Sequence, residues 1–258
     1  MTAVLDRSLI SVTGADAPKY LQSMLTNDVE RVAPGGGIYA LLLTPKARII
    51  ADLEVFGVGE GEYVLGTPVE AREAVLQALL RSRFRSKVDL QPVDGSVAWG
   101  DAEAGRATLQ TPAGRETLVD SAAPADPSVE WEIARVEAGQ PRYLREFNEE
   151  SMPAEAGVVD RAISFTKGCY PGQEPVARLF YRGHANRGVR GLRLSGPVDP
   201  GAEVSHEGRP VGRVTSPVES PRLGHIALAV LRREVEDGAV LSAGDVEAVA
   251  VPLPFTMS

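Results

Sequence analysis

The apolar residues of the chain recur at helical spacing in three stretches. In residues 16–25 they fall on one face of a helix that Asp16 can cap. A second helix is predicted to begin after Thr67, because Thr-Pro-Val-Glu has the layout of a capping box with proline at the first helical position. A third is predicted to be capped by Ser128 and to end at Gly139, since glycine commonly terminates helices.

Apolar runs bounded by glycine and proline predict strands elsewhere. Three of them, residues 38–43, 47–56 and 62–66, precede the second helix, and a glycine-rich hairpin joins the last two. Residues 96–120 alternate short strands with turns. Beyond Arg187 no long helix is predicted, and short strands between Pro/Gly turns indicate a small closed β unit. The pattern predicts an α+β fold with an all-β C-terminal part.

Composition places the chain among globular proteins. Its 258 residues, 43% apolar and 24% charged, suffice for a core that holds a small molecule. No run of about 18 apolar residues occurs, and the first residues lack the basic start and apolar stretch of a signal peptide. We therefore expect a cytoplasmic protein that does not contact membranes. Acidic residues outnumber basic ones by 35 to 27, which argues against nucleic acid as a partner.

One segment departs from this acidic balance and is called the basic strip below. Between residues 165 and 193, the only acidic residue is Glu174. The six basic residues of the strip are Lys167, Arg178, Arg182, Arg187, Arg190 and Arg193. The strip therefore forms a local cationic region on an acidic protein.

The chain contains a single cysteine, Cys169. An intrachain disulfide is impossible, and a reducing cytosol is the natural compartment. One thiol cannot hold an iron–sulfur cluster, which usually needs four protein ligands, so any cluster would belong to a partner. The three histidines, His184, His206 and His225, have no metal-ligand spacing, and no metal site is predicted.

Cys169 lies in a turn-rich loop, Phe-Thr-Lys-Gly-Cys-Tyr-Pro-Gly-Gln-Glu, that spans residues 165–174. Proline and glycine after the cysteine favour a turn. Lys167 would favour the thiolate, which is the nucleophilic form, if the two side chains converge. The alternative is a small apolar cysteine buried for packing beside a surface lysine.

Two carboxylates conflict with their predicted elements. Asp52 lies in an apolar strand and shares a face with Glu54, which predicts either a half-solvated face or a carboxylate at the mouth of a cavity, where it accepts a hydrogen bond from a ligand. Glu137 stands near the C-terminal end of its helix, where the dipole disfavours negative charge. A residue that conflicts with its local structure in this way indicates function. The alternative for Glu137 is a fully exposed glutamate without a function.

The sequence Lys-Gly-Cys-Tyr-Pro-Gly-Gln-Glu at residues 167–174 resembles the signature of the YgfZ family, relatives of the glycine-cleavage T-protein. Three further stretches are similar to the same family, residues 14–28, 43–52 and 135–139, although the family often has glycine where this chain has Ala47. The resemblance implies a ring of three subdomains around a folate pocket, with a C-terminal β-barrel.

Boundaries follow from this resemblance and from the triple glycine at residues 35–37. The first α+β subdomain is expected to be discontinuous, with residues 1–34 and 96–186. Residues 35–95 form the second α+β subdomain, and residues 187–258 form the barrel.

The same resemblance implies a tetrahydrofolate-binding protein that assists assembly or repair of iron–sulfur proteins. The ligand is tetrahydrofolate or a one-carbon derivative, and the partners are iron–sulfur client or assembly proteins. Cys169 and Lys167 are the expected working groups. Asp52, Arg135 and Glu137 are expected to hold the pterin, since carboxylates suit its N–H donors. Gln173, which stands where the T-protein has an arginine, is also expected to bind the folate.

The anionic tail of the folate is expected to bind the basic strip at Arg178, Arg182 and Arg187, because guanidinium groups pair well with carboxylates.

Two alternatives to this function remain open. The first is an enzyme that turns over a substrate, and the second is a binding module that does not. A folate-dependent aminomethyltransferase or demethylase is favoured by Asp52 and disfavoured by Gln173, which replaces the arginine of the T-protein. An RNA- or acidic-partner-binding module would use the basic strip, although its aromatic residues are few, Phe180 and Tyr181.

Overall fold

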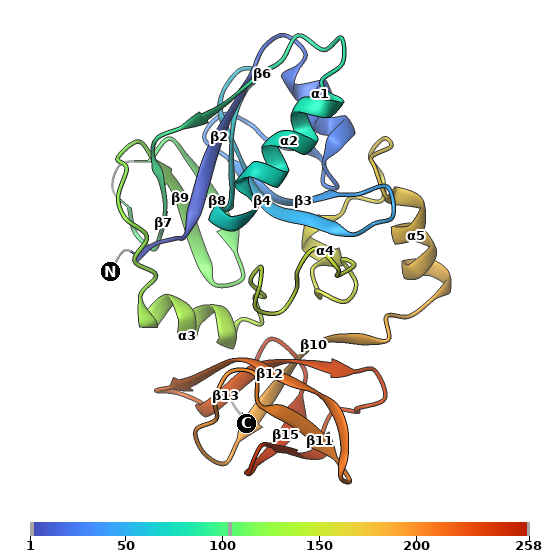
Figure 1. Ribbon diagram of the computed structural model, residues 1–258. Coiled ribbons are helices and arrows are strands. Elements are labelled where there is room, and N and C mark those ends of the chain that lie inside the picture. The colour runs from blue at the N-terminus through green and yellow to red at the C-terminus, as the bar shows by residue number, and fades with distance from the viewer. Residues whose placement is uncertain (1–2, 103–104, 257–258) are drawn as a thin grey trace.

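The computed structural model describes residues 3–102 and 105–256. Figure 1 shows two parts, an upper body of sheets and helices and a lower barrel that contains the C-terminal strands. Helices and strands are mixed in the body, as the sequence predicts, and the C-terminal part is all β.

A five-stranded antiparallel sheet forms the centre of the body, with the order β3-β4-β5-β2-β6. Its strands are β2 (Arg7–Thr13), β3 (Gly37–Leu43), β4 (Ile49–Gly59), β5 (Glu62–Pro68) and β6 (Asp89–Val93). Two helices, α1 (Ala17–Met24) and α2 (Arg72–Ser82), cover one face and share a core with it. A 3-10 turn follows α1 at Val29–Arg31.

The other face of this sheet packs against a second, four-stranded sheet with the order β1-β7-β9-β8. Its strands are β1 (Ala3–Val4), β7 (Ser96–Trp99), β8 (Ala107–Thr111) and β9 (Gly114–Val119). Helices α3 (Val129–Glu137) and α4 (Val159–Ala162) contribute to the same core. This second core is the interior in which the candidate site lies.

The C-terminal part is a closed barrel of six strands in the order β10-β13-β12-β11-β14-β15, which confirms the predicted closed β unit. The strands are β10 (Arg187–Leu194), β11 (Glu203–His206), β12 (Arg209–Ser220), β13 (Gly224–Arg232), β14 (Val240–Ala243) and β15 (Val246–Val251). Helix α5 (Gln173–Arg182) leads into β10. The sequence did not predict α5, because turn residues precede it and only one of its side chains, Val176, is buried.

The three predicted helices exist, and two of their predicted caps do not form. Ser128 Oγ accepts a hydrogen bond from Trp131 N at 3.1 Å, and Gly139 follows α3 with φ +67°, as predicted. The carboxylate of Asp16 instead accepts from Lys87 N at 2.7 Å. The capping box at Thr67 is also wrong: strand β5 continues through Thr67, and a 3-10 turn (Val69–Ala71) separates it from α2.

The predicted subdomain boundaries stay a prediction. Strand β2, from the segment 1–34, lies in the same sheet as the strands of residues 35–95. Its Ile10 and Val12 share a core with Leu42 and Leu53. The segment 1–34 and residues 35–95 thus contribute strands to one common sheet.

Candidate functional site

One face of the five-stranded sheet carries charged and polar side chains into the second core. Tyr39 pairs with Glu54 across β3 and β4, and Glu54 pairs with Gly66 of β5. Antiparallel partners share a face, and so do residues two apart in one strand, which adds Asp52 and Arg7 to this face. Two groups from other elements interact electrostatically with them, Glu116 of β9 and Arg161 of α4. These six residues, Arg7, Tyr39, Asp52, Glu54, Glu116 and Arg161, are called the buried charge layer.

Arg7 binds both strand carboxylates at once. Its NH2 atom lies 2.8 Å from Asp52 Oδ2 and 2.7 Å from Glu54 Oε1, and the two acidic side chains are 2% and 1% exposed. Gly66 makes room for this arrangement, because a Cβ there would lie 2.2 Å from Glu54 Oε2. The alternative of a half-solvated strand face is therefore wrong.

Burial dominates the electrostatics of this layer. It raises the pKa of Glu54 to about 8, and the charges of Glu116 and Asp52 add to the effect while Arg7 offsets part of it. Burial likewise raises the pKa of Glu116 and of Tyr39. Two arginines face three carboxylates, so the layer either carries excess negative charge or holds a proton at neutral pH.

Several polar atoms of the buried charge layer lack hydrogen-bond partners among the residues that the structure describes. Asp52 Oδ1 and Glu54 Oε2 have no partner, and the Glu54 oxygen accepts a hydrogen bond when ionised and donates one when protonated. The Tyr39 hydroxyl and both terminal nitrogens of Arg161 also lack partners. The Arg161 guanidinium lies 4.3 Å from the centre of the Tyr39 ring. Buried polar groups are normally paired, so these atoms are suited to a ligand or to ordered water.

A cavity of about 140 Å³ adjoins this layer. Arg7 and Glu116 belong to both the layer and the cavity wall. The ring of Trp131 also lines the cavity, and the guanidinium carbons of Arg135 and Arg142 lie 5.9 and 5.6 Å from its centre. The wall therefore combines an aromatic surface with polar groups, as in small-molecule sites generally.

Asp52 contacts the cavity wall through Arg7, and sequence analysis missed Arg7. In the structure, the protein's own guanidinium takes the place expected for a cationic ligand of Asp52. The role of Asp52 toward a ligand stays a prediction. The available signal was a basic residue at the start of an apolar strand. The ion pair between this residue and Asp52 of β4 depends on the order of the strands in the sheet, which the sequence does not show.

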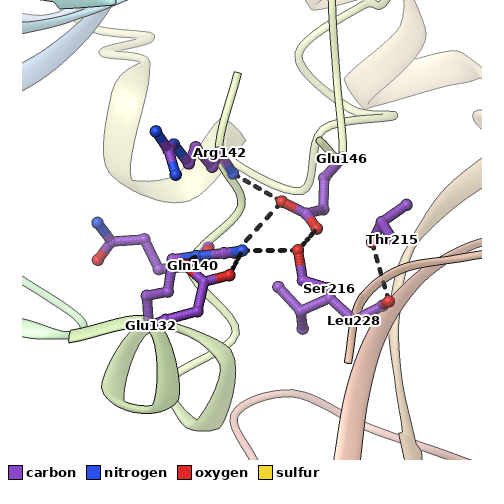
Figure 2. Close-up of polar contacts among 8 residues, drawn as sticks. Glu132, Gln140, Arg142, Glu146, Thr215, Ser216 and Leu228 are labelled. Atoms are coloured by element: carbon purple, nitrogen blue, oxygen red, sulfur yellow. Dashed lines mark hydrogen bonds and ion pairs between the residues drawn. The ribbon is translucent and has the colours of Figure 1, made fainter. Parts of the chain in front are cut away.

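Arg135 is fully buried and joins α3 to the barrel. It donates to Gln140 O at 3.2 Å and to Ser216 Oγ at 2.6 Å, and it forms ion pairs with Glu132 and Glu146. Figure 2 shows Glu146 between the backbone nitrogen of Arg142 and the hydroxyl of Ser216 on β12. Arg135 lines the cavity, but most of its donors are already engaged.

Glu137 also contacts the barrel. The Ser220 hydroxyl donates to its Oε1 at 2.5 Å, and Arg222 forms a close ion pair with its Oε2. Burial alone would raise the pKa of Glu137, but these bonds outweigh it and the pKa is lowered. Its side chain is 13% exposed, so the alternative of a fully exposed glutamate is wrong. Glu137 is not among the residues that line this cavity, and its pterin contact stays a prediction.

The cysteine loop lies on the surface. Cys169 is a free, exposed thiol, so the alternative of a buried packing cysteine is wrong. The Lys167 ammonium instead donates to Gln22 O, Leu25 O and Asn27 O at 2.5, 2.6 and 2.9 Å, near the end of α1. Burial lowers the pKa of Lys167 to about 8. Lys167 therefore fixes the loop to the body, and its effect on the thiol stays a prediction.

Gly172 allows the cysteine loop to pack on the turn at Ala47. A Cβ on Gly172 would lie 2.6 Å from Thr44 O and 3.0 Å from the Ala47 Cα, and its φ is +84°. Ala47 itself has φ +59°, a conformation that favours glycine. Gln173 is the partly buried first residue of α5, whereas Arg178 is exposed and pairs with Glu174 at 2.8 Å.

Neither Gln173 nor Arg178 lines the cavity, and their folate contacts stay predictions. Other charges of the basic strip are also paired, Arg187 with Glu155 at 3.1 Å and Arg190 with Asp237. Within the described ranges, no cluster of three or more potential metal ligands occurs. No helix there is long and apolar enough to cross a membrane.

Two domain families match this chain. Residues 4–119 match the GCVT N-terminal domain, and residues 187–256 match the glycine cleavage T-protein C-terminal barrel domain. The glycine cleavage system aminomethyltransferase T of Bartonella henselae has the same fold, with a TM-score of 0.83 over 99% of this chain and 86% of that chain, at 17% identity. The predicted fold is confirmed.

Sequence relatives cover almost the whole chain. An uncharacterized protein of Haemophilus influenzae is 32% identical over 81% of each chain. A protein of Yersinia pestis named tRNA-modifying protein YgfZ is 27% identical over 98% of this chain and 91% of its own. A mitochondrial homologue of an iron–sulfur cluster assembly factor from Phaeosphaeria nodorum is 28% identical over 88% of this chain and 69% of its own.

Proposed function

The chain belongs to the YgfZ family, related to the glycine-cleavage T-protein, and on this premise we propose that it binds a tetrahydrofolate and supports iron–sulfur proteins in the cytoplasm. The name of the Phaeosphaeria relative supports a role in cluster assembly or repair. A single cysteine is too few for a resident cluster, so the cluster belongs to the partner protein.

The observation that carries the folate proposal is the pair of buried carboxyl oxygens without partners, Asp52 Oδ1 and Glu54 Oε2. The pterin ring of a folate presents an amino group and ring N–H donors to such oxygens, and its carbonyl accepts from groups such as Tyr39 and Arg161. Bound tetrahydrofolate would supply a carrier for a one-carbon unit. The residues present therefore fit this cofactor in chemistry.

The other expected folate residues act around this centre in our proposal. Arg135 fixes the cavity wall to the barrel through Ser216. Glu137 fixes the end of α3 to the barrel through Arg222. Gln173 and Arg178 lie on α5, and Arg178, together with Arg182 and Arg187, would meet the anionic tail. The tail hypothesis predicts tighter binding of polyglutamyl than of monoglutamyl folate, with the difference shrinking as salt rises.

Cys169 is the group that faces the partner. Its thiol is exposed, and a thiolate is the form that reacts with electrophiles and metals. The test is complementation of cells that lack the gene. Cys169→Ser should fold, bind folate and fail to restore iron–sulfur enzyme activity under oxidative stress, while wild type restores it. Full restoration by Cys169→Ser would remove the thiol from the mechanism.

A further inference from the structure

Phe165 of the cysteine loop and Phe180 and Tyr181 of α5 contact one another through their rings, and the three are called the α5 aromatic cluster. Phe165 and Phe180 are stacked with ring centres 4.5 Å apart, and Tyr181 meets them edge-on at 5.6 and 5.1 Å. Phe180 is 47% exposed and Tyr181 is 67% exposed. Figure 1 shows α5 at the side of the body, where its first residues lie next to the turn between β3 and β4.

Phe165 packs against the second core and stacks on Phe180, which helps to hold α5 to the body, but the exposed parts of Phe180 and Tyr181 take no part in this packing. Val176 is the one buried side chain of the ten-residue helix. Exposed aromatic residues that contact one another form a continuous apolar surface, and such surfaces mark interaction sites. The cluster therefore has the character of a docking surface.

Charge around the cluster indicates what kind of partner fits. Arg178 is three residues before Tyr181 on the helix and shares its side, and Arg182 follows Tyr181 directly. Glu174 is the single acidic residue of α5, on a chain whose net charge is −8. An acidic partner surface complements this cationic border, whereas it would be repelled by most of the remaining chain.

We infer that the α5 aromatic cluster docks an iron–sulfur client or assembly protein that presents an apolar side chain surrounded by carboxylates. This inference rests on the proposed function. Stacking covers one face each of Phe165 and Phe180, and the net charge of −8 opposes a nucleic-acid partner, so we assign the remaining exposed ring surface to side chains of a protein. Phe165 is four residues from Cys169 in the same loop, so a docked partner comes close to the thiol.

A photo-crosslinker tests the surface directly. Benzoylphenylalanine replaces Tyr181 in the full chain in living cells, and the control places it at Phe84, an 80% exposed aromatic on a different segment. We expect adducts with iron–sulfur or assembly proteins. Mass spectrometry of these adducts should place the crosslink in an acidic peptide of the partner. Adding Arg182→Glu should reduce them at least fivefold. Nuclease-sensitive adducts, adducts only with a second copy, or yields no higher than at Phe84 would overturn the inference.

Complementation separates this inference from the proposed function. Phe180→Ser combined with Tyr181→Ser should retain the folate-induced rise in melting temperature and lose restoration of iron–sulfur enzymes, whereas Phe84→Ser should keep both. If wild type itself fails to restore the enzymes, the proposed function fails. If wild type restores them and the double variant does so equally, the docking surface alone is refuted.

Discussion

The buried charge layer and the cysteine loop place reactive groups in opposite surroundings. Asp52 and Glu54 are 2% and 1% exposed and depend on Arg7, whereas Cys169 is exposed and free. A charge inside a protein carries a desolvation cost that only good partners offset, whereas an exposed thiol carries none. In our proposal the first region holds a ligand and the second meets another protein.

Arg7→Met gives the largest expected effect, because it leaves two carboxylates buried without their cation. Breaking a buried ion pair costs about 3–5 kcal/mol, and we expect a loss of this size in the free energy of unfolding measured with urea. The matched control is the triple variant Arg7→Met/Asp52→Asn/Glu54→Gln, which should recover most of the loss. A loss below about 1 kcal/mol for the single variant would contradict a charge-dependent interior.

Glu54→Gln probes the same region through pH. The folded-state pKa of Glu54, about 8, is above its ordinary value of 4.5, so the folded protein binds the proton more tightly than the unfolded chain does. Its stabilising contribution is full below pH 4.5 and is lost as pH rises through 8. As the pH rises from 5 to 8, the melting temperature of Glu54→Gln should therefore rise relative to that of wild type.

One pKa unit corresponds to about 1.4 kcal/mol, so the gain should reach several degrees. The exposed Glu62→Gln is the control and should track wild type at both pH values. A constant difference between Glu54→Gln and wild type would show that Glu54 is already ionised at pH 5.

Ala47→Gly tests the turn beneath the cysteine loop. A left-handed alanine costs roughly 1–2 kcal/mol, and glycine removes this cost while adding up to about 1 kcal/mol of unfolded-state entropy. With φ +59° at Ala47, the substitution should stabilise the protein by about 0.5–1 kcal/mol in urea unfolding. Ala107→Gly, in a buried strand, should instead destabilise it. Destabilisation by both would mean that the turn does not need a glycine-like residue.

Cys169→Ser should change stability least, by under about 0.5 kcal/mol, because the exposed side chain has few contacts to lose. The wild-type thiol should react with iodoacetamide at neutral pH without denaturant. A thiol that reacts only after unfolding would place Cys169 in the interior and remove its contrast with the buried charge layer.

Sequence patterns predicted much of the fold, since apolar periodicity and turn residues act locally. The helices near Tyr20 and Trp131 and the C-terminal barrel follow from such signals. Helix α5 was missed because a helix whose one buried side chain is Val176 has almost no buried stripe. The capping box at Thr67 failed because pairing of β5 with β2 extends the strand through that residue.

The site was only partly predictable for a similar reason. The conflict of Asp52 and Glu54 with an apolar strand was visible in the sequence, and so was the cysteine motif. Arg7 was not, because 45 residues separate it from Asp52 and only strand order brings them together. The partners of Glu137, Ser220 and Arg222, come from the barrel and were equally hidden.

Binding of tetrahydrofolate is the central claim, and thermal unfolding of the purified full chain under reducing conditions tests it most directly. A ligand that binds only the folded state stabilises it by about 2.7 kcal/mol at a hundredfold excess over Kd. The melting temperature of wild type and of Glu62→Gln should rise by roughly 5–10 °C, whereas Asp52→Asn should lose most of this rise. No rise in the wild type with any reduced folate at millimolar concentration would contradict the account.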